Sequence, residues 1–160
     1  MERRRAGRVR ARDRRHGADR RGALALSRYC LDTSAYSWFK RGDPAVVELL
    51  DSAEWIGVPA IVLGELHQGF LRGEQRRRNE QELEAFLRFP VVEELRVDHD
   101  VARIYAEIVQ LLRAKGTPIP TNDAWVAATA ARAGVPVIAY DEHFAAVARI
   151  GVVMLEAGRG

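Results

Sequence analysis

The segment YCLDTSA, residues 29–35, opens the patterned part of this chain and decides the fold class. Its first three residues are apolar and predict a short buried strand, which the acid Asp32 follows directly. From here to Leu155, short apolar runs alternate with amphipathic segments. That alternation is typical of an α/β fold with a mainly parallel sheet.

The same pattern predicts the other elements by their apolar spacing, their helix start signals and their glycine stops. Further strands are expected at 55–58, 91–95, 135–139 and 152–155, and helices at 34–40, 44–52, 59–72, 74–89, 98–115, 122–133 and 142–149. We therefore expect one domain over residues 29–157, a three-layer α/β/α arrangement with a mainly parallel central sheet of four to five strands.

Length and composition limit the class of protein. A chain of 160 residues suits one domain with a full core, and none of its apolar runs approaches the ~20 residues that a membrane span needs. Cys30 is the single cysteine, so a disulfide within one chain is excluded. The basic N-terminus lacks the apolar stretch of a secretory signal. We expect a cytoplasmic protein with no membrane association.

The net charge of +3 conceals two unlike parts. Residues 1–28 contain eleven arginines and three acids, a net charge of +8, which leaves −5 for the remaining 132 residues. The first part has no hydrophobic period, so we interpret it as a disordered basic arm. Contact with RNA phosphates is a second interpretation of the arm. The folded part must be judged by its own residues.

Four acids stand beside the predicted elements. Asp32 and Asp141 follow strands, Asp123 begins the helix before the second of these strands, and Glu65 lies within a helix. Each has an ordinary explanation. Asp32 and Asp141 could cap helices, Asp123 lies where a helix N-terminus favours negative charge, and Glu65 could belong to a solvated face. However, parallel strands place their carboxyl ends at one edge, where open α/β sheets bind ligands.

Together the four acids predict a metal site. Clustered carboxylates cannot all stay ionised without a compensating cation, and a hard divalent ion with oxygen ligands supplies that charge. Such an ion can activate water and neutralise charge at a phosphodiester. The chain has no serine–histidine arrangement and no phosphate-binding glycine loop that would favour other chemistry.

Several strings taken together resemble PIN domains, and most of all the VapC-type toxins of bacterial toxin–antitoxin pairs. They are YCLDTSA (29–35), GEL (64–66) with Gly69, PIPTNDAWVAATA (118–130) and YDEHF (140–144), in the family's order. Ala139 departs from the pattern, since many relatives have threonine or serine there.

This resemblance implies a PIN-like nuclease domain that hydrolyses RNA with Mg²⁺ or Mn²⁺. It implies that the catalytic and metal-binding residues are Asp32, Glu65, Asp123 and Asp141. Thr33 or Ser34 would order metal-bound water, with Asn122 as a further neighbour of the ions. By the same resemblance we expect a homodimer held inactive by a cognate antitoxin protein.

Two other functions fit parts of the pattern. A non-catalytic PIN-fold regulatory or binding protein could act with an antitoxin, and a receiver-like signalling domain also places acids at strand ends. A receiver has adjacent acids after its first strand, whereas Asp32 stands alone. Two weaker signals have ordinary interpretations: the basic cluster at 72–78 as a solvated face, and His143 as a surface or hydrogen-bonding residue rather than a phosphate contact.

Overall fold

A single five-stranded sheet forms the centre of the computed structural model, which describes residues 27–158. All neighbouring strands pair in parallel, in the order β3-β2-β1-β4-β5. The strands are β1 (Arg28–Leu31), β2 (Trp55–Pro59), β3 (Val92–Leu95), β4 (Val137–Ala139) and β5 (Val152–Met154). The predicted α/β class and the five predicted strands are confirmed.

Helices fill the connections between the strands. In the described residues they are α1 (Thr33–Lys40), α2 (Pro44–Ser52), α3 (Ala60–Arg72), α4 (Arg76–Leu87), α5 (His99–Ala114), α6 (Thr121–Ala133) and the 3₁₀ helix η1 (Glu142–Ala146). Local chemistry sets several ends. Asp43 caps α2 ahead of Pro44, Asp98 caps α5, and Gly134 ends α6 at a φ of 69°, a conformation that favours glycine.

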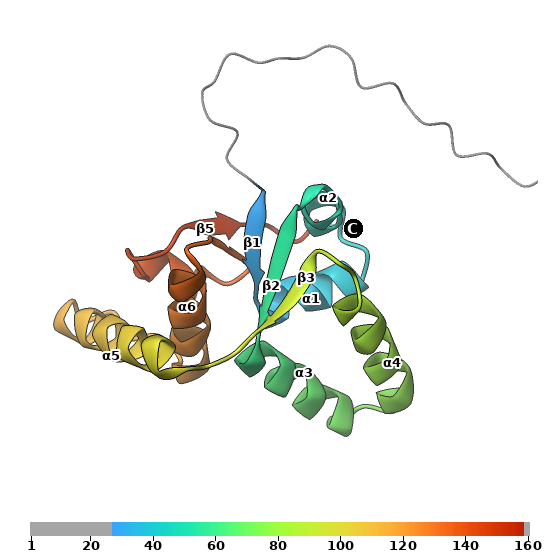
Figure 1. Cartoon of the computed structure of the whole chain (residues 1–160), viewed down its shortest axis with the longest axis horizontal. Helices are drawn as coiled ribbons and strands as arrows, with labels where there is room; N and C mark the ends of the chain where they lie inside the picture. Colours follow the sequence, from blue (N-terminus) through green and yellow to red (C-terminus); the bar gives the residue numbers. More distant parts are fainter. Residues whose placement is uncertain (1–26, 159–160) are drawn as a thin grey trace, which may run out of the picture.

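The strand order explains the layers. The chain moves outward from β1 to β2 and β3, then returns to the other side of β1 for β4 and β5. Because parallel crossovers are almost always right-handed, the helices of the two halves cover opposite faces of the sheet. Figure 1 shows α5 and α6 on one side of the strands and α1, α2 and α4 on the other.

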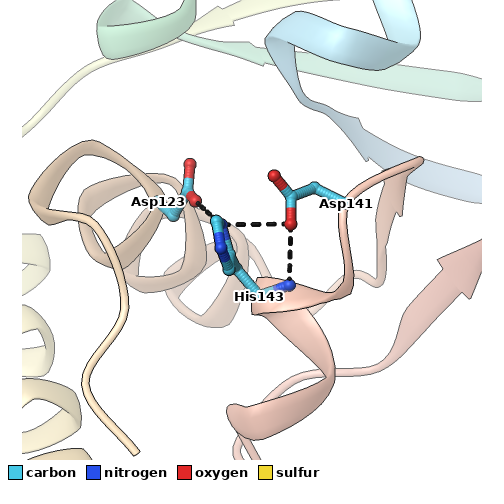
Figure 2. A group of neighbouring side chains, drawn as sticks. All are labelled: Asp123, Asp141 and His143. Carbon is cyan, nitrogen blue, oxygen red and sulfur yellow. Dashed lines mark hydrogen bonds and ion pairs between the residues drawn. The ribbon is translucent and has the colours of Figure 1, made fainter.

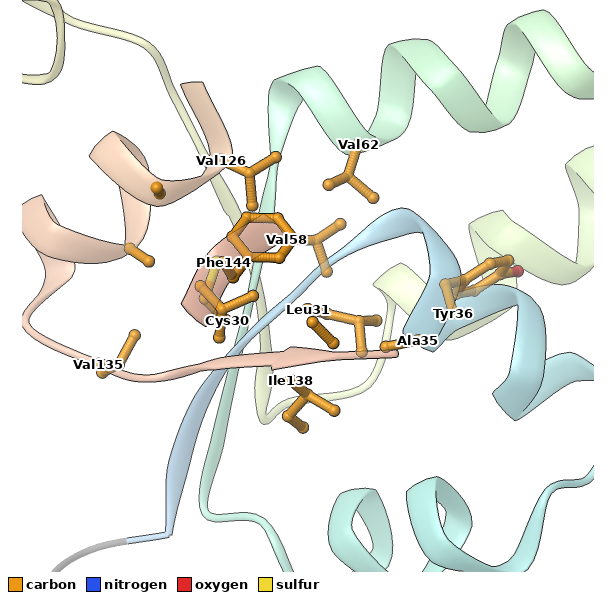
Figure 3. Close-up of a cluster of buried hydrophobic side chains, with 14 of the residues drawn as sticks. Cys30, Leu31, Ala35, Tyr36, Val58, Val62, Val126, Val135, Ile138 and Phe144 are labelled. Carbon is orange, nitrogen blue, oxygen red and sulfur yellow. The ribbon is translucent and has the colours of Figure 1, made fainter. Parts of the chain in front are cut away.

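The core lies between these layers. Strand β4 and the second half of β1, Cys30 and Leu31, are apolar and buried, as expected for parallel strands with helices on both faces. Alanines on the buried face of α6 bring this helix close to the sheet. Figure 3 shows side chains from most layers meeting in one cluster, among them Leu31, Val58, Val62, Val126, Ile138 and Phe144.

One element differs from its prediction. We predicted a helix over 142–149, but η1 is a 3₁₀ helix that ends at Ala146. Its buried residue is Phe144, and Val147, which directly follows the helix, is buried as well. A 3₁₀ helix has three residues per turn, so the chain reaches Val147 one turn after Phe144, again on the side of the core.

The predicted basic arm falls almost entirely on residues 1–26, outside the described residues. Arg28, which we assigned to the arm, is the first residue of β1, and its guanidinium lies 4.7 Å from the centre of the Trp55 ring. None of the described helices is both long and apolar enough to cross a membrane.

Candidate active site

The register of β1 and β4 brings the first and last acids to neighbouring strand ends. Leu31 pairs with Ile138, and the amide of Asp32 lies 3.5 Å from the carbonyl oxygen of Ile138. Between these two strands the chain order of the sheet reverses. Such a reversal opens a crevice at the carboxyl ends of the strands, which is the usual ligand site of open α/β sheets.

Asp32 begins α1 and is nearly buried, with 5% of its surface exposed. Its Oδ1 accepts hydrogen bonds from the amide of Ala35 at 2.8 Å and from the hydroxyl of Ser34 at 2.7 Å. Burial raises the pKa of Asp32 to about 6, and the nearby charge of Asp123 adds to this, although the two hydrogen bonds oppose it. The predicted capping role and the predicted place in the acid cluster are thus both realised.

Glu65 reaches the same place from α3. Val62 and Leu66 on that helix are buried, and Glu65 lies between them in sequence on a half-buried face. The hydroxyl of Thr33 donates a hydrogen bond to Oε1 of Glu65 at 2.9 Å. This bond links the first turn of α1 to the middle of α3, so it fixes the glutamate relative to Asp32.

Asp123 and Asp141 meet on either side of a histidine ring. Figure 2 shows the His143 ring, from η1, between Asp123 of α6 and Asp141 at the end of β4. Its Nδ1 lies 2.9 Å from Oδ2 of Asp123 and 3.0 Å from Oδ1 of Asp141. Burial raises the pKa of Asp123, and the charges of Asp141 and Glu65 also raise it, while His143 lowers it.

These side chains surround a cavity of about 250 Å³. It is lined by Asp32, Thr33, Ser34, Glu65, Asp123, Val126 and Asp141. Two larger cavities, of about 340 and 530 Å³, lie elsewhere on the described surface. In the first of these the acid Glu82 is paired with Lys40 and Arg78, and in the second three acids are matched by three arginines. Of these three cavities, the smaller one is therefore the one with excess negative charge.

All but one of the predicted site residues line this cavity. The exception is Asn122, which is exposed at the start of α6 and does not reach it. The contact of His143 with both aspartates was not predicted. Its sequence signal was weak, because only its position two residues after Asp141 pointed to the site.

The donor set fits a hard divalent cation. Four carboxylates face one cavity, and within residues 27–158 the single basic group that contacts them is His143. Asp123, Asp141 and His143 each offer an atom within 4.8 Å of the others, close enough to share an ion, whereas Asp32 and Glu65 lie on the cavity wall outside this close group. Carboxylate oxygens are the ligands that Mg²⁺ and Mn²⁺ prefer.

A parallel five-stranded sheet with acids gathered at its switch point fits the PIN domain that the sequence resembles. Residues 29–150 match the family model of the PIN domain, and the chain belongs to this family. Within it, the chain is homologous to the VapC ribonucleases. It is 32% identical to Ribonuclease VapC4 of Mycobacterium tuberculosis over 134 residues, which is 82% of this chain and 100% of the relative.

Solved structures agree with this assignment. The structure of VapBC-5 from Mycobacterium tuberculosis, a member of the VapBC family of toxin–antitoxin systems, superposes with a TM-score of 0.63 at 26% identity, covering 81% of this chain and 99% of the other. VapBC2 from Rickettsia felis, bound to a DNA fragment from its promoter, superposes with a TM-score of 0.70 at 23% identity, covering 79% and 98%. The second likeness supports the fold.

Proposed function

We propose that this protein is an endoribonuclease that hydrolyses RNA phosphodiester bonds with carboxylate-bound Mg²⁺ or Mn²⁺ and acts as the toxin of a toxin–antitoxin pair. One observation carries the proposal. Acids from four separate segments of a PIN-family chain converge on one cavity at the switch point of the sheet. No packing or capping need explains why all four should meet there.

The residues around the cavity fall into two groups, those that would hold the cation and those that orient them. Asp32, Glu65, Asp123 and Asp141 would hold the cation, which supplies an activated water and neutralises charge on the phosphate. Thr33 orients Glu65, and Ser34 orients Asp32, through the hydrogen bonds of their hydroxyls. Val126 supplies the apolar part of the cavity wall.

The partners follow from the relatives. VapBC-5 is a member of a family of toxin–antitoxin systems, so we propose that a cognate antitoxin binds this chain and that the chain forms a homodimer. RNA substrates and a buried, unpaired cysteine are consistent with action in the cytoplasm. A small DNA-binding protein encoded beside this gene is the expected antitoxin, and co-purification of the two proteins would test the pairing.

The nuclease is tested with the purified full chain and a mixed RNA substrate. We expect cleavage with Mg²⁺ or Mn²⁺, and none after chelation by EDTA. Asp32→Asn combined with Asp123→Asn should lower the rate to below about 1% of wild type, because the substitutions remove two of the four charges that hold the ion. Asp51→Asn is the matched control, since Asp51 is exposed on α2.

Two results would count against this function. Full activity of the doubly substituted protein would show that the cleavage does not depend on Asp32 and Asp123. Antitoxin binding without cleavage under any divalent metal would favour the alternative, a non-catalytic PIN-fold regulatory protein.

A further inference from the structure

Tyr140, the residue before Asp141, does not line the cavity but is anchored at three points. Its hydroxyl donates a hydrogen bond to Oδ1 of Asp43 at 2.7 Å. Its ring stacks on Trp38 of α1, with ring centres 5.5 Å apart and an angle of 30° between the planes. Its main-chain amide donates to the hydroxyl of Ser34 at 3.3 Å. Both the backbone and the side chain of this residue are therefore held.

Asp43 is a fixed point for this anchor. Only 7% of its surface is exposed, and its carboxylate caps α2 by accepting from the amide of Ala45 at 3.2 Å. Its second oxygen accepts from the amide of Gly158 at 3.1 Å. At neutral pH an aspartate is anionic and a tyrosine is neutral, so the bond from Tyr140 is charge-assisted and strong.

The anchor reaches both ends of the candidate metal site. The Ser34 hydroxyl that accepts from Tyr140 also donates to Oδ1 of Asp32. On the other side, Asp141 is the next residue in the chain, its side chain is 46% exposed, and it is followed by a short 3₁₀ helix. The amide and the ring Nδ1 of His143 each lie 3.0 Å from Oδ1 of Asp141, and apart from these contacts the half-exposed side chain has little packing to fix its position.

We propose that Tyr140, held by Asp43, is a positioning residue that sets the place of Asp141 relative to Asp32 across the cavity. The proposal rests on the proposed function, since it assumes that these two acids share a cation. Phenylalanine at position 140 would retain the stacking on Trp38. The hydroxyl group is therefore the part of the side chain that the link to Asp43 requires.

The decisive variant is Tyr140→Phe, with Mn²⁺ binding to the metal-free protein measured by electron paramagnetic resonance. We expect the dissociation constant for Mn²⁺ to rise about tenfold, as for loss of one charge-assisted hydrogen bond. The cleavage rate at saturating Mn²⁺ should stay close to that of the wild type, because the acids themselves remain. A purely structural role would lower the unfolding temperature without changing Mn²⁺ affinity far below that temperature.

A second variant weakens the same hydrogen bond from its other end, so the test does not depend on whether Tyr140→Phe folds normally. Asp43→Asn retains an acceptor for Tyr140 and a cap for α2 but removes the charge, so Mn²⁺ affinity should fall by only about threefold. In Tyr140→Phe combined with Asp43→Asn the two effects should not multiply, since both act on one bond. Tyr105→Phe is the matched control, because Tyr105 lies on α5 and stacks on Trp125.

Wild-type Mn²⁺ affinity in both Tyr140→Phe and Asp43→Asn would overturn the proposal, as would effects that multiply in the double variant. Either result would leave the metal site itself intact. Absence of Mn²⁺ binding to the wild-type protein would instead remove the proposed function, and the positioning role with it.

Discussion

Asp32 combines two roles that have opposite requirements. As the cap of α1, its carboxylate accepts hydrogen bonds that stabilise the ionised form. Its burial and the nearby charge of Asp123 both disfavour that ionised form. The free energy lost by burying this charge is what a bound cation would recover. The free energy of unfolding of the metal-free protein should therefore depend on whether Asp32 is ionised.

The first prediction concerns pH. Folding raises the pKa of Asp32 to about 6, so the folded protein holds this proton more tightly than the unfolded chain does. The contribution of Asp32 to stability is greatest below its ordinary pKa near 4 and decreases as the pH rises through about 6, by roughly 3 kcal/mol in all. Urea unfolding in EDTA at pH 5 and pH 8 should show about half of this difference, because pH 5 already lies above the ordinary pKa of the carboxyl group. Mg²⁺ should restore stability at pH 8.

Asp32→Asn isolates this contribution. Asparagine retains the cap but carries no charge, so the metal-free variant should be more stable than wild type at pH 8 and similar to it at pH 4. The same difference in Asp51→Asn would show that the effect belongs to overall charge and not to the buried site.

His143 supports a second prediction, on metal preference. Its Nδ1 adds a nitrogen atom to an otherwise all-oxygen donor set. Nitrogen ligands favour transition-metal ions over Mg²⁺, so His143→Gln should weaken Mn²⁺ binding more than Mg²⁺ binding. Isothermal titration calorimetry gives, for each ion, the ratio of the dissociation constant of the variant to that of the wild type. His99→Gln, at the exposed start of α5, is the control and should change neither the Mn²⁺ nor the Mg²⁺ affinity. Equal losses of affinity for both ions in His143→Gln would contradict the prediction.

At the scale of elements, the bond from Thr33 to Glu65 joins α1 to α3. Thr33→Val keeps the shape of the side chain but removes the donor, which should cost about 1 kcal/mol of stability. Freed from this bond, Glu65 should also bind metal less firmly, so the Mg²⁺ concentration for half-maximal cleavage should rise. Ser52→Ala removes a hydroxyl that bonds within α2 only, and it should leave the Mg²⁺ dependence unchanged.

The sequence predicted the elements that carry strong local signals. Alternating apolar runs marked all five strands, and Asp43-Pro44 marked the start of α2 at the observed residue. The helix over 142–149 was wrong in type and length, because its burial pattern reflects packing against the rest of the core rather than local periodicity. The role predicted for Asn122 stays a prediction: this residue is exposed at the start of α6, whereas Asp123 and Val126 of the same helix line the cavity.

Long-range contacts were beyond the reach of sequence reasoning. The bond from Tyr140 to Asp43 spans 97 residues and the contact of His143 with Asp123 spans 20. Neither has a periodic or local signature in the chain. The placement of the four acids beside predicted strands and helices, together with the resemblance to PIN domains, was enough to name them. The groups that hold them in place became visible only when the strands were paired.

At the scale of the whole molecule, assembly is open to direct measurement. Leu111 is 54% exposed on α5, a helix that Figure 1 shows projecting from the sheet. A homodimer that covers this helix would bury the side chain. Light scattering should then give twice 17.9 kDa for the wild type and a lower mass for Leu111→Asp. Gln110→Asp adds the same charge without removing an apolar group and should remain dimeric.

The place of β4 beside β1 has a consequence for synthesis. The ribosome releases β1 early, but its partner on one side emerges about a hundred residues later, on the order of 5–20 s at ordinary elongation rates. Until then β1 has an open edge and Asp32 lacks Asp123 and Asp141. A nascent chain of this kind carries an incomplete set of acids while it is still attached to the translation machinery, and the complete set can form only after β4 has been made.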